Sequence, residues 1–363
     1  MNKAIDNIYI TNLGVKKNEK VIVFTDSHTE DLKKVAISIA EAGHKFTSRL
    51  KFIEFKSTEC HGVEPPEGLW KETFGENIYA EFKKRKLFEP ILKKKTSAKQ
   101  REIIEKIVEV YKKDAAKVVI GLSHYSTSHT RFRDLLNRIC KTRYASMPLF
   151  DKDMLTGPMK VNWEKMQIRS KEIEKTVNRY EEIEIISENG TNIVFSKSGR
   201  KAMSDTGIIT KPGGFCNLPA GEVYLAPLEG TANGTLVLEW APTRKLNSPV
   251  TVNIKNGIAV SLEGDEVFVK ELQTKFDEAK ENRNIAELGI GTNDKALRPD
   301  NILESEKIFG TIHIAFGDNS SFGGKIRANF HQDFVFFKPT MTLISKTGKR
   351  VTLLKKGKLV NNK

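Results

Sequence analysis

The hydrophobic positions of residues 1–160 alternate between short continuous runs and stripes with helical spacing. Residues 20–26, KVIVFTD, are an apolar run of the kind that a parallel sheet buries on both faces, whereas residues 28–44 carry apolar side chains at helical spacing. Residues 97–113 form a second helical stripe, and residues 115–140 repeat the order strand, loop, helix. This alternation predicts an open, mostly parallel α/β domain.

The pattern changes near residue 160. Residues 162–182 are predicted to form a helix, and the alternating segments beyond it surround Asn189-Gly190 and Asn256-Gly257, dipeptides that favour tight hairpin turns. A further helix is expected over residues 266–282, and the remaining segments are strand-rich. Residues 161–363 are therefore predicted to be an α+β domain with mixed or antiparallel sheets, and the candidate metal-binding and catalytic residues considered below all lie in it.

Composition limits the class of protein. The chain has 363 residues, of which 39% are hydrophobic, so it can bury a sizeable core. No apolar run approaches the roughly 18 residues that span a bilayer, and the first residues lack the features of a signal peptide. Three cysteines, Cys60, Cys140 and Cys216, show no CxxC spacing and are expected to be reduced residues in or near the core. We therefore expect a cytoplasmic protein without a membrane partner.

The net charge of +14 raises the question of nucleic-acid binding, because clustered lysine and arginine neutralise phosphates. The basic runs at residues 83–86, 93–95 and 346–363 are separated from one another by segments that contain acidic residues, and they lie in different regions. No single basic face is indicated, so we expect a solvated surface and no nucleic-acid partner.

Candidate chemistry is concentrated in residues 311–337, TIHIAFGDNSSFGGKIRANFHQDFVFF. Alternate side chains of a strand share a face, so His331 and Asp333 should point the same way, and His313 should point away from its apolar neighbours. Imidazole and carboxylate groups on adjacent strands are ligands for zinc, cobalt, manganese or iron. Taken singly, His313 is more simply explained as a core histidine and His331 as a surface one, whereas the HxD pair joined to another histidine by a Gly-rich loop makes metal binding a comparable alternative.

Two glutamates strengthen the metal hypothesis. Glu222 stands in GGFCNLPAGEVYLAP and Glu287 in AELGIGTND, both among small and apolar residues. A buried carboxylate is costly unless it is paired or bound to a metal. Each glutamate therefore needs a partner that its local sequence does not supply.

Four motifs in this order, NLPAGEVYLAP, ELGIGTN, GTIHIAFGDN and HQD, resemble those of the aminopeptidase T and aminopeptidase S family of leucyl aminopeptidase-like, thermophilic-type metallo-aminopeptidases. The resemblance implies a homodimer that removes N-terminal residues from short peptides with a water activated by two divalent ions of zinc, cobalt or manganese. It also implies that Glu287 bridges the metals or acts as the catalytic base. The metal ligands that it implies are Glu222, Glu287, His313, His331 and Asp333.

The sequence departs from that family at two positions. Known members carry a glutamate five residues before the histidine and a tyrosine seven residues after it, where this chain has Ile308 and Ser320. The tyrosine would be a donor suited to an oxyanion. Glu306 or Asp318 could replace the missing carboxylate, although Asp318 could equally serve only in a turn.

The chain also resembles, more distantly, the dihydroxypyridine ring-cleaving dioxygenases, which share the aminopeptidase fold and hold one iron. That resemblance implies an iron bound by His313, His331 and Asp333, a set with the composition of a facial triad for oxygen activation. The iron site would not require Glu222 and Glu287, so we favour the aminopeptidase interpretation. A non-enzymatic descendant that binds peptides or another protein is a third possibility, which the complete ligand set argues against.

Overall fold

The computed structural model describes residues 2–26, 28–264 and 266–360. The chain folds into two compact units, Met1–Lys160 with Gly207–Pro219, and Val161–Thr206 with Ala220–Lys363. Residues 207–219, which the sequence analysis places in the second domain, thus pack with the first unit. The reason is β8, a short strand in this segment that pairs with a strand of the first unit.

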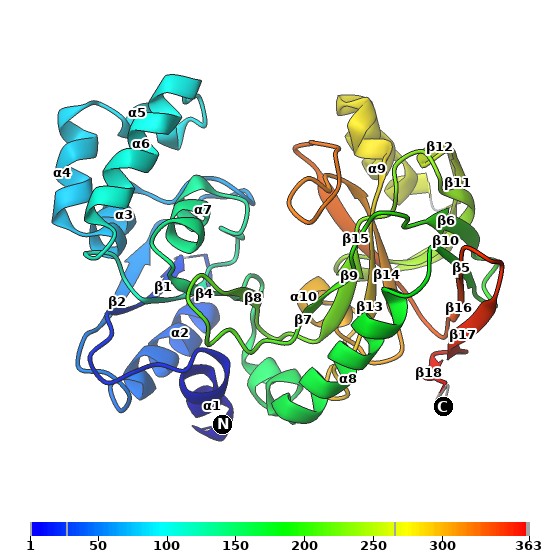
Figure 1. Cartoon of the computed structure of the whole chain (residues 1–363), viewed down its shortest axis with the longest axis horizontal. Coiled ribbons are helices and arrows are strands. Elements are labelled where there is room, and N and C mark those ends of the chain that lie inside the picture. Colours follow the sequence, from blue (N-terminus) through cyan, green and yellow to red (C-terminus); the bar gives the residue numbers. More distant parts are fainter. Residues whose placement is uncertain (1, 27, 265, 361–363) are drawn as a thin grey trace. The chain divides into compact units, whose positions relative to one another are not determined.

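The first unit contains a five-stranded sheet in the order β2-β1-β3-β4-β8 (Figure 1). All four strand pairings are parallel, as predicted for an α/β domain. Every residue of β1, β3 and β4 is buried, which explains the continuous apolar runs. The strands are β1 (Val21–Asp26), β2 (Leu50–Phe55), β3 (Val118–Leu122), β4 (Arg143–Ser146) and β8 (Phe215–Asn217).

Helices connect and cover these strands. The two predicted helices begin at side-chain caps: Thr29 accepts a hydrogen bond from the backbone N–H of Leu32, and Ser97 forms a capping box with Gln100. The Thr130 side chain caps a third helix. The helices are α1 (Asn2–Asn7), the π-helix η1 (Ile8–Asn12), α2 (Glu30–Gly43), α3 (Glu67–Phe74), α4 (Glu76–Lys84), α5 (Phe88–Leu92), α6 (Ala98–Tyr111), α7 (Arg131–Arg138), and the 3-10 helices η2 (Lys152–Leu155) and η3 (Pro158–Lys160).

The second unit has an antiparallel eight-stranded sheet in the order β12-β11-β10-β6-β5-β16-β17-β18. Both predicted hairpins are present, with Asn189-Gly190 between β5 and β6 and Asn256-Gly257 between β11 and β12. Asn256 and Gly257 have φ values of 51° and 77°, as a type I′ turn requires. The strands are β5 (Glu182–Ile186), β6 (Asn192–Ser196), β10 (Asn233–Ala241), β11 (Arg244–Lys255), β12 (Ile258–Glu263), β16 (Thr340–Ile344), β17 (Arg350–Lys355) and β18 (Lys358–Leu359).

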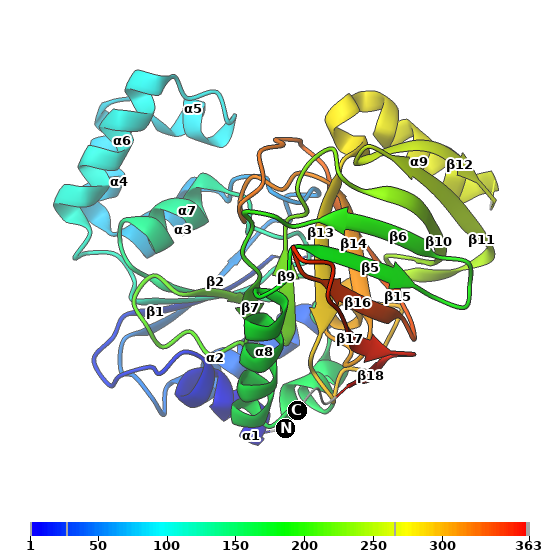
Figure 2. The same cartoon turned by 45° about the vertical axis from the view of Figure 1, so that its right-hand side comes forward.

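A second antiparallel sheet of this unit has the order β15-β14-β13-β9-β7 (Figure 2). One hydrophobic core draws side chains from both sheets, and the five-stranded sheet contributes alternate residues such as Ile312, Ile314 and Phe316. Its other face is therefore left for polar side chains. Its strands are β7 (Met203–Asp205), β9 (Glu222–Leu225), β13 (Ile285–Gly291), β14 (Ile312–Gly317) and β15 (His331–Phe336).

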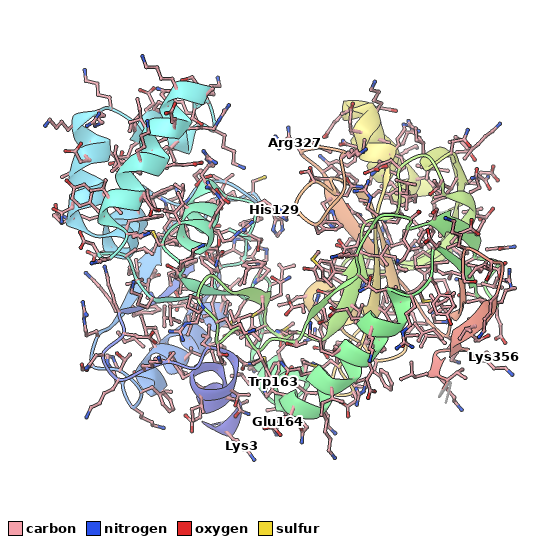
Figure 3. The ribbon with its side chains drawn as sticks, viewed as in Figure 1. Lys3, His129, Trp163, Glu164, Arg327 and Lys356 are labelled. Atoms are coloured by element: carbon pink, nitrogen blue, oxygen red, sulfur yellow. The ribbon has the colours of Figure 1, made fainter. Side chains whose placement is uncertain are left out.

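Four helices complete the second unit. The predicted helix near residue 162 is α8 (Trp163–Val177), which begins with buried Trp163 and exposed Glu164 (Figure 3). The others are α9 (Glu266–Glu278), the 3-10 helix η4 (Lys280–Arg283) and α10 (Ile302–Ser305). Across the described parts of both units, no helix combines the length and the apolar character that crossing a bilayer demands. Of the three cysteines, Cys140 and Cys216 are buried as expected, but Cys60 is exposed.

Candidate metal centre

The polar face of the five-stranded sheet carries the predicted site residues on neighbouring strands. Asp333 on β15 is paired with Ala315 on β14, and Ala315 is paired with Glu287 on β13. His313 is paired with Gly289 of β13, and Glu222 at the start of β9 is paired with Gly291. Because the residues between them are alanine or glycine, the histidines and carboxylates can converge above the sheet.

The five expected ligands lie within a few ångströms of one another. The Nε2 atom of His313 is 3.4 Å from Oε2 of Glu222 and 3.7 Å from Oε1 of Glu287. The Nε2 atom of His331 is 3.3 Å from Oε2 of Glu287 and 3.4 Å from Oδ2 of Asp333. As predicted, His331 and Asp333 share one face of their strand. Glu287 stands between the two histidines.

These side chains form two groups that could each hold a metal ion. Glu222, Glu287 and His313 offer ligand atoms within 4.8 Å of one another, and so do Glu287, His331 and Asp333. Glu287 belongs to both groups. The iron set that the dioxygenase resemblance implies spans both groups: His313 lies in the first group, and His331 and Asp333 lie in the second.

Hydrogen bonding prepares His331 to bind a cation. Its Nδ1 atom lies 2.8 Å from the carbonyl oxygen of Asp318, so this nitrogen carries the proton and donates it. Nε2 is then the nitrogen at which a metal can replace a proton, an arrangement common around metal-binding histidines. The Oδ1 atom of Asp333 is buried without a hydrogen-bond partner among the described residues. A bound cation would satisfy that oxygen, so the donor set fits a divalent metal.

Gly289 provides the space for the His313 ring. A Cβ atom built on Gly289 would lie 1.9 Å from both Cε1 and Nε2 of His313. Any larger residue at this position would therefore collide with the imidazole. This requirement explains a glycine in the middle of a buried strand, where glycine otherwise weakens pairing.

Two neighbouring residues, Glu306 and Lys307, extend the cluster beyond the predicted set. The Nζ atom of Lys307 lies 2.8 Å from Oε1 of Glu222 and 2.8 Å from Oε2 of Glu306, and the Lys307 side chain is 1% exposed. Glu306 thus supplies a carboxylate close to the position that Ile308 leaves without one. No sequence pattern singled out Lys307, because a Glu-Lys pair between a short helix and a strand is typical of an exposed loop.

Charge coupling controls protonation in the cluster. Burial alone would lower the pKa of His313, but hydrogen bonding to Glu287 and the charges of nearby carboxylates outweigh it and raise the pKa to about 9. Burial likewise opposes the charged form of His331, yet Asp333 and Glu287 hold its pKa well above the usual range. Burial would raise the pKa of Asp333, but the two histidines keep it low. Without metal, protons therefore occupy the imidazoles.

The Lys307 end of the cluster behaves differently. Burial would lower the pKa of Lys307, but the charges of Glu222 and Glu306 hold it well above the usual range. Burial raises the pKa of Glu306 to about 7, against the opposing influence of Lys307. The ammonium therefore keeps its charge at neutral pH.

Aromatic side chains border the cluster. Tyr224 lies two residues after Glu222 on β9, so the two share a face of that strand. The Phe322 ring lies 5.9 Å from the Tyr224 ring and 6.0 Å from the His331 ring, measured between centroids. The period of two along β9 could have identified Tyr224 from the sequence, whereas Phe322 lies in a loop without a regular pattern. Ser320 is exposed and its hydroxyl contacts Asp318.

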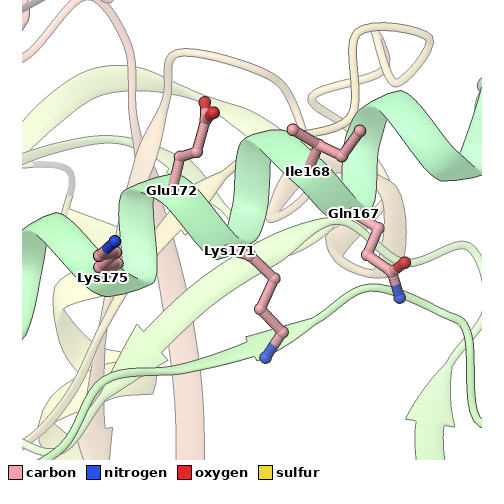
Figure 4. A pocket seen from close by; sticks show the side chains of 5 residues that line it. All are labelled: Gln167, Ile168, Lys171, Glu172 and Lys175. Atoms are coloured by element: carbon pink, nitrogen blue, oxygen red, sulfur yellow. The ribbon is translucent and has the colours of Figure 1, made fainter.

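A separate hollow lies along α8 and contains none of the clustered residues (Figure 4). All of its lining residues belong to that one helix, so no second element faces them. The lining residues are Gln167, Ile168, Lys171, Glu172 and Lys175.

Comparison with known proteins connects the cluster to one family. The family model described as NicX, 2,5-dihydroxypyridine 5,6-dioxygenase, matches residues 159–360, which include all of the clustered side chains. No curated protein matches the chain.

Two solved structures have a similar fold over nearly the whole chain. A 2,5-dihydroxypyridine dioxygenase from Pseudomonas putida KT2440 is 15% identical, with a TM-score of 0.72, and the match covers 100% of this chain and 97% of that one. Wild-type AmpT from Thermus thermophilus is 14% identical, with a TM-score of 0.60, and the match covers 99% and 98%. At these identities the similarity shows a shared fold.

Proposed function

The chain belongs to the NicX family of 2,5-dihydroxypyridine 5,6-dioxygenases, and from this premise we propose that it is a ring-cleaving dioxygenase that uses one iron(II) ion on a dihydroxylated pyridine or a closely related ring. The observation that carries the proposal is that the family match spans the whole histidine and carboxylate cluster. It supports the dioxygenase interpretation over the aminopeptidase one.

The residues that would hold the iron are His331, Asp333 and Glu287, whose ligand atoms lie within 4.8 Å of one another. Imidazole and carboxylate donors suit iron(II), and the unsatisfied Oδ1 of Asp333 supplies a buried negative charge for it. His313 lies on the other side of Glu287 and provides a second imidazole. The bound ion would supply the activation of dioxygen that the protein side chains lack.

The protein's own side chains would bind the ring and move protons. The family name describes cleavage between ring carbons 5 and 6 with both atoms of dioxygen retained, so the ring itself is the reductant and no further electron donor is needed. Tyr224 and Phe322 offer aromatic surfaces beside the cluster, and such surfaces favour planar ligands. Glu287 and His313 form a buried carboxylate–imidazole pair that can accept the proton of a ring hydroxyl group.

Oxygen uptake by the iron-loaded protein tests this proposal. Protein loaded anaerobically with iron(II) should consume one molecule of dioxygen for each 2,5-dihydroxypyridine, and 2-hydroxypyridine should serve as the substrate control. Asp333→Asn should lower the rate at least about 100-fold, because it removes a ligand charge. Absence of uptake with every dihydroxylated ring tested would refute the proposal.

One observation favours a second candidate, a two-metal aminopeptidase. The cluster holds four carboxylates, of Glu222, Glu287, Glu306 and Asp333, more than one iron requires, and AmpT shares the fold. Several carboxylates are what two divalent ions need to balance their charge. Release of amino acids from short unblocked peptides by zinc-, cobalt- or manganese-loaded protein, without oxygen uptake, would favour this candidate.

A further inference from the structure

We propose that the buried ammonium group of Lys307 takes the place of a second divalent ion, so that the cluster binds one metal ion per chain. The inference rests on the proposed function for the identity of that ion, while the number of ions follows from the contacts of Lys307. The lysine thereby determines which of two reaction types this fold can support.

The position of Lys307 is the first support. Its Nζ atom lies 2.8 Å from Oε1 of Glu222, and Glu222 is a member of the first metal-binding group but not of the second. A metal ion in the first group would have to share Glu222 with a cation already in contact with it. The ion pairs of the Lys307 ammonium are with Glu222 and Glu306, and neither residue belongs to the second group, Glu287, His331 and Asp333.

The backbone on either side holds Lys307 in place. Its N–H donates to the carbonyl oxygen of Glu304 at 3.0 Å, and its own carbonyl oxygen accepts from the N–H of Asn293 at 2.8 Å. The side chain is 1% exposed, so the ammonium has no route to solvent without leaving two buried carboxylates unpaired. Such a loss would be costly, and the lysine therefore stays in the cluster when a metal binds.

Charge balance gives the same result. The carboxylates of Glu222, Glu287, Glu306 and Asp333 carry at most four negative charges, which two divalent ions would neutralise in a cluster without lysine. Lys307 supplies one positive charge, so a second divalent ion would leave an excess of positive charge in a buried site. Like charges at such short range repel strongly in a low dielectric, and the second ion is disfavoured.

The first group then has a positioning role. With Glu222 bound to Lys307 through Oε1, its Oε2 faces His313 at 3.4 Å, and His313 in turn faces Oε1 of Glu287 at 3.7 Å. This chain of contacts orients the carboxylate of Glu287, which is one of the metal ligands of the second group. Lys307 thus acts on the bound metal through Glu222, His313 and Glu287.

The test is the number of manganese(II) ions bound at saturation, measured by equilibrium dialysis with elemental analysis on the full chain. We expect one ion for the wild type and two for Lys307→Met, which keeps the length of the side chain but removes its charge. Lys295→Met is the matched control, because Lys295 is an exposed lysine in the same connection between β13 and β14, and it should bind one ion. Two ions in the wild type, or one in Lys307→Met, would overturn the proposal.

An electron paramagnetic resonance spectrum gives an independent readout. Two manganese ions about 3.5–4 Å apart produce a spin-coupled signal, which should appear in Lys307→Met and not in the wild type. If Lys307→Met does not fold because Glu222 and Glu306 lose their cation, Lys307→Gln provides a neutral amide that can still donate hydrogen bonds to these carboxylates, and it keeps all four carboxylates and both metal-binding groups. It should bind two ions, and a single ion would overturn the proposal.

The ion count separates this inference from the proposed reaction. A wild-type protein that binds one ion but consumes no oxygen would refute the dioxygenase proposal and support the role of Lys307. A wild-type protein that binds two ions would overturn the role of Lys307 whatever reaction it catalyses.

Discussion

Replacement of Gly289 by alanine should disturb the cluster directly, because the new methyl group would overlap the His313 ring. The built Cβ lies 1.9 Å from Cε1 and Nε2 of His313 and 2.7 Å from its Cδ2, whereas ordinary contact begins at 3.4 Å. The overlap is therefore 3.4 − 1.9 = 1.5 Å. The ring is 1% exposed and stands beside Glu222 and Glu287, so it cannot retreat by that distance without breaking its contacts.

The expected cost follows from this overlap. Forcing one extra methyl group into a packed site costs about 1–3 kcal/mol of unfolding free energy, which we expect for the metal-free protein. Displacement of His313 should also weaken manganese binding about 10–100-fold, the usual effect of losing a group that orients a metal ligand. Urea denaturation followed by circular dichroism gives the first quantity, and calorimetric titration gives the second.

Two controls make the reasoning refutable. Gly68→Ala, in α3, has no atom within 4 Å of the new methyl group and should stabilise the protein by about 0.5–1 kcal/mol through helix propensity. In a His313→Ala background, where the ring is absent, Gly289→Ala should lose most of its cost, a coupling that a double-mutant cycle measures. Unchanged stability and metal affinity in Gly289→Ala, or an equal cost in both backgrounds, would show that Gly289 does not accommodate the ring.

Three other predictions concern protons and local stability. In the metal-free protein, despite burial, Asp333 and Glu287 hold the pKa of the ligand His331 well above its usual range, so manganese binding at pH 7 should release a proton from His331 and strengthen as the pH rises. Titrations in buffers of different ionisation enthalpy would detect the released proton, and a proton count of zero would contradict this prediction. The pKa of His313 is about 9 in the folded metal-free protein and about 6.5 when unfolded, so the stability that its proton adds should be complete below about pH 6.5 and disappear as the pH rises to about 9. Urea denaturation across that range would show this loss, and a free energy of unfolding that does not change with pH would be the contrary result. In the first unit, the buried Glu64 carboxylate accepts hydrogen bonds from the backbone N–H groups of Arg131 and Phe132. Glu64→Ala should therefore lower the free energy of unfolding by about 1–3 kcal/mol, whereas replacement of the exposed Glu41 by alanine should change it by no more than about 0.5 kcal/mol. Equal effects of the two variants in urea denaturation would argue against a structural role for Glu64.

The periodicity of the sequence predicted the parallel sheet, the two hairpins and the strand faces, because these depend on local patterns. His331 and Asp333 share a face, and Ile312 and Ile314 point to the core, as a period of two requires. The sequence pattern did not show that β8 belongs to the first unit, because this short strand carries no pattern that identifies β4 as its partner strand.

The composition of the site was predicted more completely than its charge balance. The isolated glutamates Glu222 and Glu287 stood out because they lie among small and apolar residues. Lys307 did not stand out in the sequence, because its burial results from contacts with Glu222, a residue 85 positions away. The spacing to His313 pointed to Ile308, and of the two replacements that the sequence offered, Glu306 and Asp318, it is Glu306 whose carboxylate contacts Lys307 in the cluster. Such contacts depend on the three-dimensional pairing of β9 and β13, which no local pattern records.

The most direct test of the proposed reaction is the origin of the oxygen atoms in the product. Iron-loaded protein incubated with 2,5-dihydroxypyridine under ¹⁸O-labelled dioxygen should yield a ring-opened product in which mass spectrometry finds both atoms of one labelled molecule, apart from exchange with water. A ring that stays intact, or a product without the label, would contradict the dioxygenase account of this chain.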